Sequence, residues 1–343
     1  MATMTRFGRS TGALAREVMT ILVTILGLLV VTFLIARVMP VDPVLAVVGD
    51  NARPDVYEKA RLDMGLDKPL VIQFWLYISK VFQGDFGKSV LTSNLVIDDI
   101  RRVFPATLEL ATLGTLIGIT LGIPLGVLAA TKQGRWPDHI ARFVGLFGYS
   151  IPIFWLGLMG LLLFYAKLGW VGGPGRIDVA YQDFVTPMTG ILLLDCALQG
   201  EWDAFWNAAS HLVLPSSVLG LFSTAYISRM TRSFMITELQ QHYVITARVK
   251  GLSEMRVVWG HALRNAIVPL LTVIALSYAN LLEGSVLTET VFAWPGLGRY
   301  ITNSLLQSDM NAVLGGTIVV GTVFVGINLL SDVLARTFDP RAR

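Results

Sequence analysis

Six long stretches of the sequence contain no charged residue, and each is close to the length of a membrane-crossing helix. They are residues 18–36, 110–131, 143–166, 204–228, 265–282 and 310–331. A helix of about 20 apolar residues crosses the hydrocarbon core of a bilayer, and charged side chains inside that core are costly. The pattern therefore predicts an all-α polytopic membrane protein with six transmembrane helices, joined by segments of ordinary polarity.

The segment between the first two stretches carries a helical pattern of its own. Residues 55–64 are polar and favour a helix, and Gly65 is placed to end it in a left-handed conformation. Apolar residues then recur at helical spacing from Leu70 to Phe82. We expect this second helix to lie on the membrane surface or on a neighbouring span, or to form a small helical cap over the bundle.

The distribution of basic residues predicts the orientation of the chain. If the N-terminus lies in the cytoplasm, the segments on that side hold 15 basic and six acidic residues. The basic ones are Arg6, Arg9, Arg16, Lys132, Arg135, Arg142, Arg229, Arg232, Arg248, Lys250, Arg256, Arg264, Arg336, Arg341 and Arg343. The two short outer loops hold only Lys167, Arg176 and Arg299. Because short cytoplasmic loops are enriched in Lys and Arg, we expect both termini in the cytoplasm.

The first charge-free stretch is expected to stay in the mature protein as an anchor helix, because no small-x-small cleavage site follows it. Together with the long outer segment it forms an N-terminal part, residues 1–109. Residues 110–343 form the core membrane domain, which includes the largest cytoplasmic loop, residues 229–264.

Composition agrees with a membrane protein and excludes other classes. The 343 residues are 54% hydrophobic and 15% charged, and a mean hydropathy of +0.63 excludes a soluble globular protein. Cys196 is the single cysteine, so no intrachain disulfide and no cysteine-based metal site can form; we interpret it as a small apolar residue in a loop. The net charge of +3 is explained by the basic cytoplasmic segments, so we expect no nucleic-acid partner.

Motifs for catalysis or nucleotide binding are missing from the sequence. Gly87-Lys88-Ser89 resembles the end of a phosphate-binding loop, but the upstream glycine of such a loop is replaced by Phe82. The four histidines include no pair at metal-ligand spacing, and we interpret His211 as a hydrogen-bonded residue at the border of a span. No nucleophile elbow is present. We therefore assign no catalytic, cofactor-binding or metal-binding residue to this chain.

The charge-free stretches also bear on energy coupling. Ion-coupled carriers usually keep Asp, Glu or Lys near the middle of the bilayer to bind the driving ion. Here the nearest candidates, Glu283 and Glu289, flank the outer end of the fifth stretch. If the protein moves solutes, the pattern favours energy supplied by another subunit, with an ion-coupled secondary transporter as the alternative.

The loop of residues 229–264 has the most specific pattern. A helix that runs through Lys250 is expected to end at Gly251, which adopts a left-handed conformation at little steric cost. Ser253 suits an N-cap, with Glu254 in the first turn of the next helix. Apolar residues then follow at α-helical spacing, namely Met255, Val258, Trp259, Ala262 and Leu263. The result is a corner that either inserts into a partner as a rigid knob or is a simple surface hairpin.

This loop resembles the coupling loop of ABC importer permeases, in the branch for dipeptides, oligopeptides and nickel. The similarity lies in Tyr243–Ser253 and His261–Pro269. The general importer signature is Glu-Ala-Ala, three residues, Gly and later Ile-x-Leu-Pro. This chain has Ile245-Thr246-Ala247 in place of the first triplet, keeps Gly251, and has its proline at 269 instead of 264, which is habitual in the peptide branch. Other segments similar to family motifs are Gly65–Pro69, Gly84–Ser89, Ser150–Trp155 and Glu289–Gly298.

The resemblance implies the type I permease fold of ABC importers, and the long outer segment looks like the first, or B-type, permease subunit. The implied partners are a second permease subunit, two ATP-binding subunits that carry ATP and Mg, and an extracytoplasmic solute-binding protein in a bacterial inner membrane. The implied ATPase-coupling residues are Thr246, Ala247, Arg248, Lys250, Gly251, Leu252, Ser253 and Glu254.

Substrate is the least determined property. Uncharged spans suit a permissive conduit that leaves selection to the binding protein, and the scarcity of histidines makes nickel harder to credit. The expectation is therefore peptides, with opines, sugars and glutathione left open.

Overall fold

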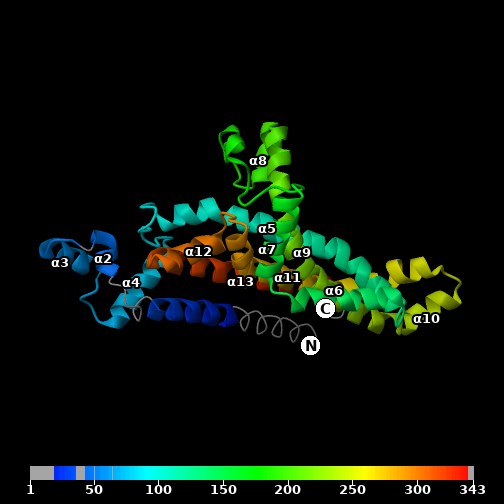
Figure 1. The fold of residues 1–343 in the computed structure, drawn as a ribbon. Helices are drawn as coiled ribbons and strands as arrows, with labels where there is room; N and C mark the ends of the chain where they lie inside the picture. The colour runs from blue at the N-terminus through cyan, green and yellow to red at the C-terminus, as the bar shows by residue number, and fades with distance from the viewer. Residues whose placement is uncertain (1–18, 36–42, 50, 64, 339–343) are drawn as a thin grey trace, which may run out of the picture. The chain divides into compact units, whose positions relative to one another are not determined.

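The computed structural model describes residues 19–35, 43–49, 51–63 and 65–338, and it is helical in all six charge-free stretches (Figure 1). The basic residues Arg6, Arg9, Arg16, Arg341 and Arg343, which support the predicted orientation, lie outside the described residues. The chain divides into two compact units. One holds residues 1–101 and 300–325, and the other holds residues 102–299 and 326–343.

The first unit is built around the apolar helix Met19–Ile35. Its other elements are α2 (Pro43–Val48), α3 (Pro54–Asp63), α4 (Leu70–Phe82) and parts of α5, α12 (Leu297–Leu306) and α13 (Met310–Phe338). The sequence predicted α3 and α4, and Gly65 between them has a φ of +68° as expected. Leu29, Ile78 and Ile318 form a buried cluster, so α4 packs on helix Met19–Ile35 and on α13. Of the three locations left open by the sequence, this packing supports the one on a neighbouring span.

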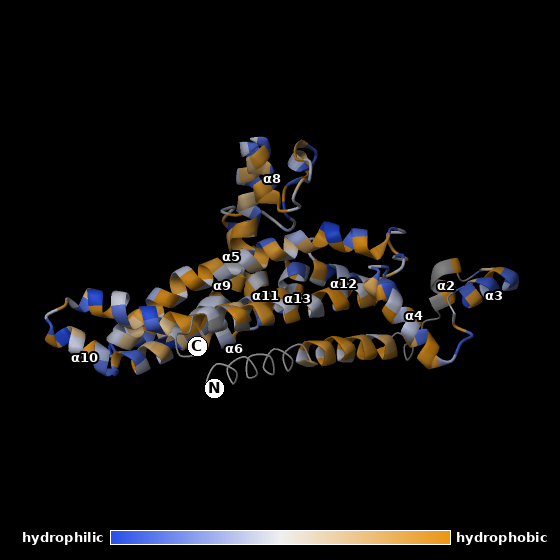
Figure 2. Ribbon diagram, turned by 180° about the vertical axis from the view of Figure 1, so that it is seen from behind, coloured by the Kyte–Doolittle hydropathy of each residue, from blue (hydrophilic) through white to orange (hydrophobic). Residues whose placement is uncertain are grey.

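The second unit contains most of the long helices. In chain order its elements are α5 (Val96–Thr131), α6 (Trp136–Ser150), α7 (Ile153–Gly160), the π-helix η1 (Leu161–Lys167), the 3-10 helix η2 (Val179–Phe184), α8 (Leu192–Gln199), α9 (Trp202–Leu239), α10 (His242–Val249), the π-helix η3 (Arg256–Ala262) and α11 (Leu263–Val291). Cys196 is buried inside α8, so its assignment to a loop was wrong. Hydrophobic residues, orange in Figure 2, are frequent along the long helices.

Four helices are each long and apolar enough to cross a membrane alone: Val96–Thr131, Trp202–Leu239, Arg256–Val291 and Met310–Ser331. The third charge-free stretch differs from a straight span, because Trp136–Ser150 and Ile153–Lys167 meet at an angle of 98°. Pro152 has no N–H to donate to the carbonyl of Gly148, and Ile151 is extended, which ends the first helix. Four spans, or five with the bent pair, are therefore present by length and composition among the described residues.

Glycines at four-residue intervals allow α5 to approach α9 closely. A Cβ on Gly118 would lie 2.1 Å from the Ser223 hydroxyl, and one on Gly126 would lie 2.6 Å from the Ser228 carbonyl. Small residues at this spacing let two membrane helices pack with their backbones in contact. The α5–α9 contact is thus fixed by the absence of side chains along one face of α5.

Candidate functional site

The corner predicted at Gly251 is present and has the geometry of a Schellman motif. Gly251 has a φ of +79°. Its N–H donates to the carbonyl of Arg248 at 2.9 Å, and the N–H of Leu252 donates to the carbonyl of Ala247 at 3.2 Å. These two hydrogen bonds satisfy carbonyls that the last turn of α10 leaves open. The prediction that Gly251 ends this helix in the left-handed region is confirmed.

The helix after the corner is wound more widely than predicted. Helical residues begin at Glu254, directly after Ser253, but Arg256–Ala262 form a π-helix. A π-helix has more residues per turn, so residues five apart share a face. Accordingly Val257 and Ala262 are both fully buried, whereas Met255 is 74% exposed. The predicted apolar stripe was therefore wrong at Met255 and at Trp259, which is 37% exposed, because it assumed α-helical spacing.

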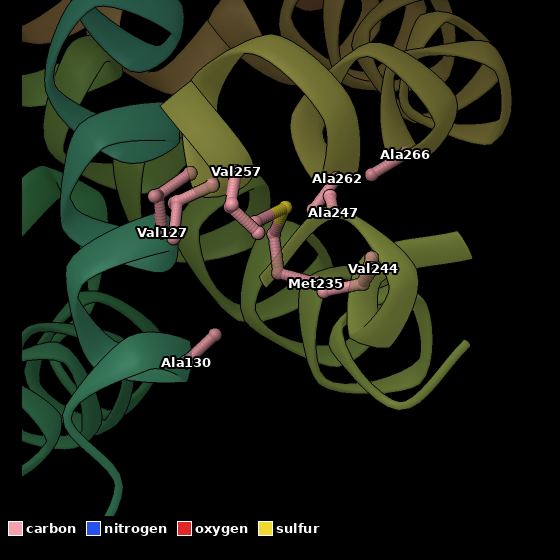
Figure 3. Packing of buried hydrophobic residues seen from close by; sticks show 9 residues of the cluster. Val127, Ala130, Met235, Val244, Ala247, Val257, Ala262 and Ala266 are labelled. Atoms are coloured by element: carbon pink, nitrogen blue, oxygen red, sulfur yellow. The ribbon is translucent and has the colours of Figure 1, made fainter. Parts of the chain in front are cut away.

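A compact apolar cluster fixes the corner to three long helices (Figure 3). Met235 of α9 lies at its centre, fully buried, and contacts from the other elements surround it. The members come from α5 (Val127, Ala130), α10 (Val244, Ala247), η3 (Val257, Val258, Ala262) and α11 (Ala266). Leu252, the residue after Gly251, also packs against this cluster. The cluster therefore packs the corner against α5, α9 and α11 in one close-packed region.

The outward side of the corner presents apolar and charged groups together. Val249 is 82% exposed, and Ile245 and Met255 are also exposed. We refer to Ile245, Val249 and Met255 as the apolar tip. Exposed apolar groups rimmed by charges are typical of a surface that contacts another protein.

The eight predicted coupling residues divide into two sets. Ala247 is buried and Leu252 is half-buried in the cluster, whereas the others are exposed, namely Thr246, Arg248, Lys250, Gly251, Ser253 and Glu254. The structure places all eight in one corner. Sequence reasoning missed Ile245 and Val249 as exposed apolar residues. The available signal was helical spacing: if Val244 and Ala247 face inward, Ile245 and Val249 fall on another face of the helix.

A polar anchor near the corner was not predicted. Asp138 at the start of α6 is fully buried and accepts hydrogen bonds from Arg232 of α9, at 2.6 Å and 3.2 Å. Arg142 and the N–H of Gly134 also donate to this carboxylate. A buried carboxylate is stable only with such partners. The pair Asp138–Arg232 therefore fixes α6 to α9 beside the loop.

The opposite end of α11 carries a second buried carboxylate. Glu289 is fully buried and accepts hydrogen bonds from Thr107, Ser285 and the N–H of Arg299, at 2.7, 2.9 and 2.8 Å. A Cβ on Gly296 would lie 2.3 Å from the Glu289 carboxyl carbon, so the turn that follows needs glycine there. The Glu289–Gly298 motif is thus a structural turn that joins α11 to α5.

His211 and Glu109 hold the segment between η1 and α9. The Nδ1 atom of His211 lies 2.9 Å from the carbonyl of Gly173, which confirms the interpretation of a hydrogen-bonded histidine. Glu109 of α5 pairs with Arg176, and both are largely buried. These contacts attach the segment to the membrane helices.

Comparison with known proteins gives a consistent result. The family model described as binding-protein-dependent transport system inner membrane component matches residues 122–343, and the model of its N-terminal part matches residues 11–111. The chain is 42% identical to the "Probable D,D-dipeptide transport system permease protein DdpB" of Escherichia coli (strain K12), over 94% of each chain. It is also 42% identical to the "Di/tripeptide transport system permease protein DppB" of Pseudomonas aeruginosa (strain UCBPP-PA14), over 96% of this chain and 98% of that one.

Among solved structures, the chain is similar to the inward-facing MetNI methionine ABC transporter, with 18% identity and a TM-score of 0.49 over 68% of this chain and 93% of that one. The family model covers more than half of the chain, and both named relatives are matched along nearly their whole length. The chain therefore belongs to the family of binding-protein-dependent transport system inner membrane components.

Proposed function

We propose that this chain forms half of the translocation pathway of an ATP-driven importer and that its Gly251 corner couples the pathway to an ATPase. The chain is a multi-pass inner-membrane transport permease. In the proposal it carries no catalytic site, and ATP is hydrolysed on partner subunits. The proposed assembly adds a second permease subunit, two ATP-binding subunits with their ATP and Mg, and an extracytoplasmic solute-binding protein. In it this chain has the type I permease fold, with six spans and both termini in the cytoplasm.

The observation that carries the proposal is the apolar tip on a rigid base. Val249 and Met255 are 82% and 74% exposed, while Ala247 and Val257, each two residues away from one of them, are held in the cluster around Met235. A surface of this kind gains free energy when a partner covers it. We propose that Thr246, Ala247, Arg248, Lys250, Gly251, Leu252, Ser253 and Glu254 form or support the part that enters a cleft of an ATP-binding subunit.

Coupling then follows from packing. When the ATP-binding subunits close, the corner moves with them, and the apolar cluster carries that motion to α5, α9 and α11. The Asp138–Arg232 pair moves α6 with α9. The helices tilt as a group because each is fixed to the same small cluster.

Peptides are the proposed substrates. Two relatives that cover nearly the whole chain are named for D,D-dipeptide and for di- and tripeptide transport. The ion-coupled carrier is not favoured, because these relatives are named as permease proteins of transport systems.

Reconstitution tests the proposal. Vesicles that contain the two permeases and the ATP-binding subunits should take up a dipeptide when supplied with ATP and the loaded binding protein. Vesicles that hold this chain alone, with a proton or sodium gradient and no ATP, should show no uptake. Gradient-driven uptake by this chain alone would refute the proposal.

A further inference from the structure

Arg229 lies at the end of the fourth charge-free stretch and is held by aromatic rings. Its guanidinium carbon is 4.9 Å from the ring centre of Tyr149 on α6 and 5.9 Å from that of Tyr226 on α9. Tyr149 in turn contacts the ring of Phe222 at 5.2 Å. We name Arg229, Tyr149 and Tyr226 the cation cage.

The guanidinium points from the end of the fourth charge-free stretch back along α9 toward the middle of that stretch. Helices α6 and α9 are antiparallel, because Asp138 pairs with Arg232 while Gly148 packs on Ala225. Tyr149 is 11 residues beyond Asp138, which is about 16 Å along a helix axis. Helical side chains lean toward the N-terminus of their own helix, so Arg229 and Tyr149 lean toward each other. An arginine that only reached for the bilayer surface would point the other way, toward Arg232.

Among the described residues, no carboxylate forms an ion pair with Arg229. Its side chain is exposed. Tyr149 is 44% exposed. Arg229 follows the last residue of the stretch 204–228, so its guanidinium lies inside the cytoplasmic end of the span; there it faces water or another protein, because facing lipid would be costly. Aromatic faces stabilise the cation while they leave its N–H donors free to bind an anion.

The cage adjoins the break between α6 and α7. Tyr149 precedes Ser150, Ile151 and Pro152, where the two helices meet at 98°. Ser150 and Pro152 are exposed, and Pro152 offers no N–H to the Gly148 carbonyl. Irregular backbone at membrane depth is tolerated where it is buried in protein or lines an aqueous cavity. Both features therefore indicate that this part of the chain faces the pathway.

We propose that the cation cage binds the C-terminal carboxylate of a peptide during passage, through the guanidinium of Arg229. A guanidinium matches a carboxylate with two parallel hydrogen bonds, which an ammonium group cannot reproduce. The inference rests on the proposed function, since it requires that peptides pass through this chain.

The test uses the assembled transporter in vesicles, with alanyl-alanine and alanyl-alanine amide as probes. The binding protein is loaded to the same measured occupancy with each probe, so that capture does not differ between them. Arg229→Gln should lower ATP-driven uptake of alanyl-alanine about tenfold or more, the effect of losing a charge-assisted hydrogen bond, and should change uptake of the amide less than about twofold. Arg229→Lys should fall between wild type and Arg229→Gln. Lys132→Gln, an exposed cation at the end of α5, is the matched control and should leave both rates unchanged.

Two further variants keep the test decisive. Tyr149→Phe keeps the ring and should transport both probes normally, whereas Tyr149→Leu should lower the preference for the carboxylate while Arg229 is still present. Equal loss for both probes, or failure of Arg229→Gln to assemble with the second permease, would overturn the inference, because Arg229 would then pair with a partner carboxylate or a lipid phosphate. Unchanged uptake of alanyl-alanine would overturn it as well. If wild type takes up neither probe with ATP, the proposed function fails instead.

Discussion

Arg248 and Glu254 form a two-point ion pair across the Gly251 corner. The Nε atom of Arg248 lies 2.8 Å from one carboxylate oxygen of Glu254, and an Nη atom lies 3.2 Å from the other. The side chains are 42% and 66% exposed. An exposed pair of this kind stabilises a fold by about 1 kcal/mol or less. The pair therefore contributes little to the stability of the corner, and its main effect is to orient the Arg248 side chain along the corner.

Arg248 and Glu254 should consequently respond differently to removal. If Arg248 contacts an acidic group of the ATP-binding subunit, Arg248→Ala should lower dipeptide uptake severalfold more than Glu254→Ala, which only frees the arginine. Neither change should alter the yield of protein in the membrane. The measurement is the dipeptide uptake rate of each variant, normalised to transporter content. A larger loss in Glu254→Ala would contradict a role of Arg248 in docking.

The apolar tip should be sensitive to charge. Val249→Asp and Met255→Asp place a carboxylate where the docked partner excludes water, which costs more than the roughly 1–3 kcal/mol of an unpaired neutral polar group. We expect weaker association with the ATP-binding subunits, by about tenfold or more, with normal membrane insertion. Co-purification at a series of salt concentrations measures this association. Val56→Asp, at an exposed apolar position in α3, is the matched control; an equal loss there would show that the effect is not local.

Substitution of Gly251 should strain the backbone without causing a steric clash. No atom lies within 4 Å of the position that a Cβ would occupy, yet the φ of +79° disfavours residues with side chains. Gly251→Val should cost about 1–2 kcal/mol or more at the corner and abolish uptake without affecting insertion. Gly251→Asn, which tolerates the left-handed region, should retain most of the activity. Normal uptake and ATPase stimulation in Gly251→Val would refute the role of this corner.

The α5–α9 contact should resist even one added methyl group. Gly118→Ala puts a Cβ 2.1 Å from the Ser223 hydroxyl and 2.5 Å from its Cβ, so the two helices must separate. Overpacking of this kind typically costs about 1–3 kcal/mol. Gly145→Ala on α6 has nothing within 4 Å of the new Cβ and serves as the control. Thermal unfolding in detergent should show a lower midpoint only for Gly118→Ala, and a partial recovery in the double variant with Ser223→Gly.

Asp195 makes the segment before α9 sensitive to acid. Burial alone would raise the pKa of this carboxyl, but hydrogen bonds from the Thr189 hydroxyl and from the N–H groups of Met188, Thr189 and Gly190 together lower it below 3.8. A lowered pKa in the folded state stabilises the fold above the unfolded value, and that stability is lost as the pH falls through the folded pKa.

We therefore expect amide exchange at Thr189 and Gly190 to be slow and constant above about pH 5, after correction for intrinsic rates, and to lose protection at lower pH. Asp195→Asn keeps an acceptor oxygen but cannot titrate, so its protection should not change with pH. The same acid sensitivity in both proteins would exclude Asp195 as the cause.

Much of the architecture could be predicted from the sequence because it depends on local chemistry. Charge-free stretches marked each long helix, Gly65 and Gly251 marked helix ends that need a positive φ, and the pattern from Leu70 to Phe82 marked α4. In each case the evidence lies within a few residues of the feature. A resemblance in the same loop pointed to the family that the comparisons show.

The features that could not be predicted depend on partners far apart in the chain or on helix winding. Hydropathy carries no information on the direction of a helix axis, so the sequence predicted one straight span where the chain bends by 98° at Pro152. The π-helical turn exposes Met255, although α-helical spacing placed it inside. The Asp138–Arg232 pair joins residues 94 positions apart, and no local pattern pairs them.

Crosslinking from position 249 tests the central claim most directly. A photo-reactive amino acid replaces Val249 in the assembled transporter, and a second preparation carries it at position 56 as the control. The coupling account predicts a covalent adduct between this chain and an ATP-binding subunit from position 249 and none from position 56. If position 249 yields no adduct with an ATP-binding subunit, or only one with the second permease, the Gly251 corner is not where the ATPase attaches.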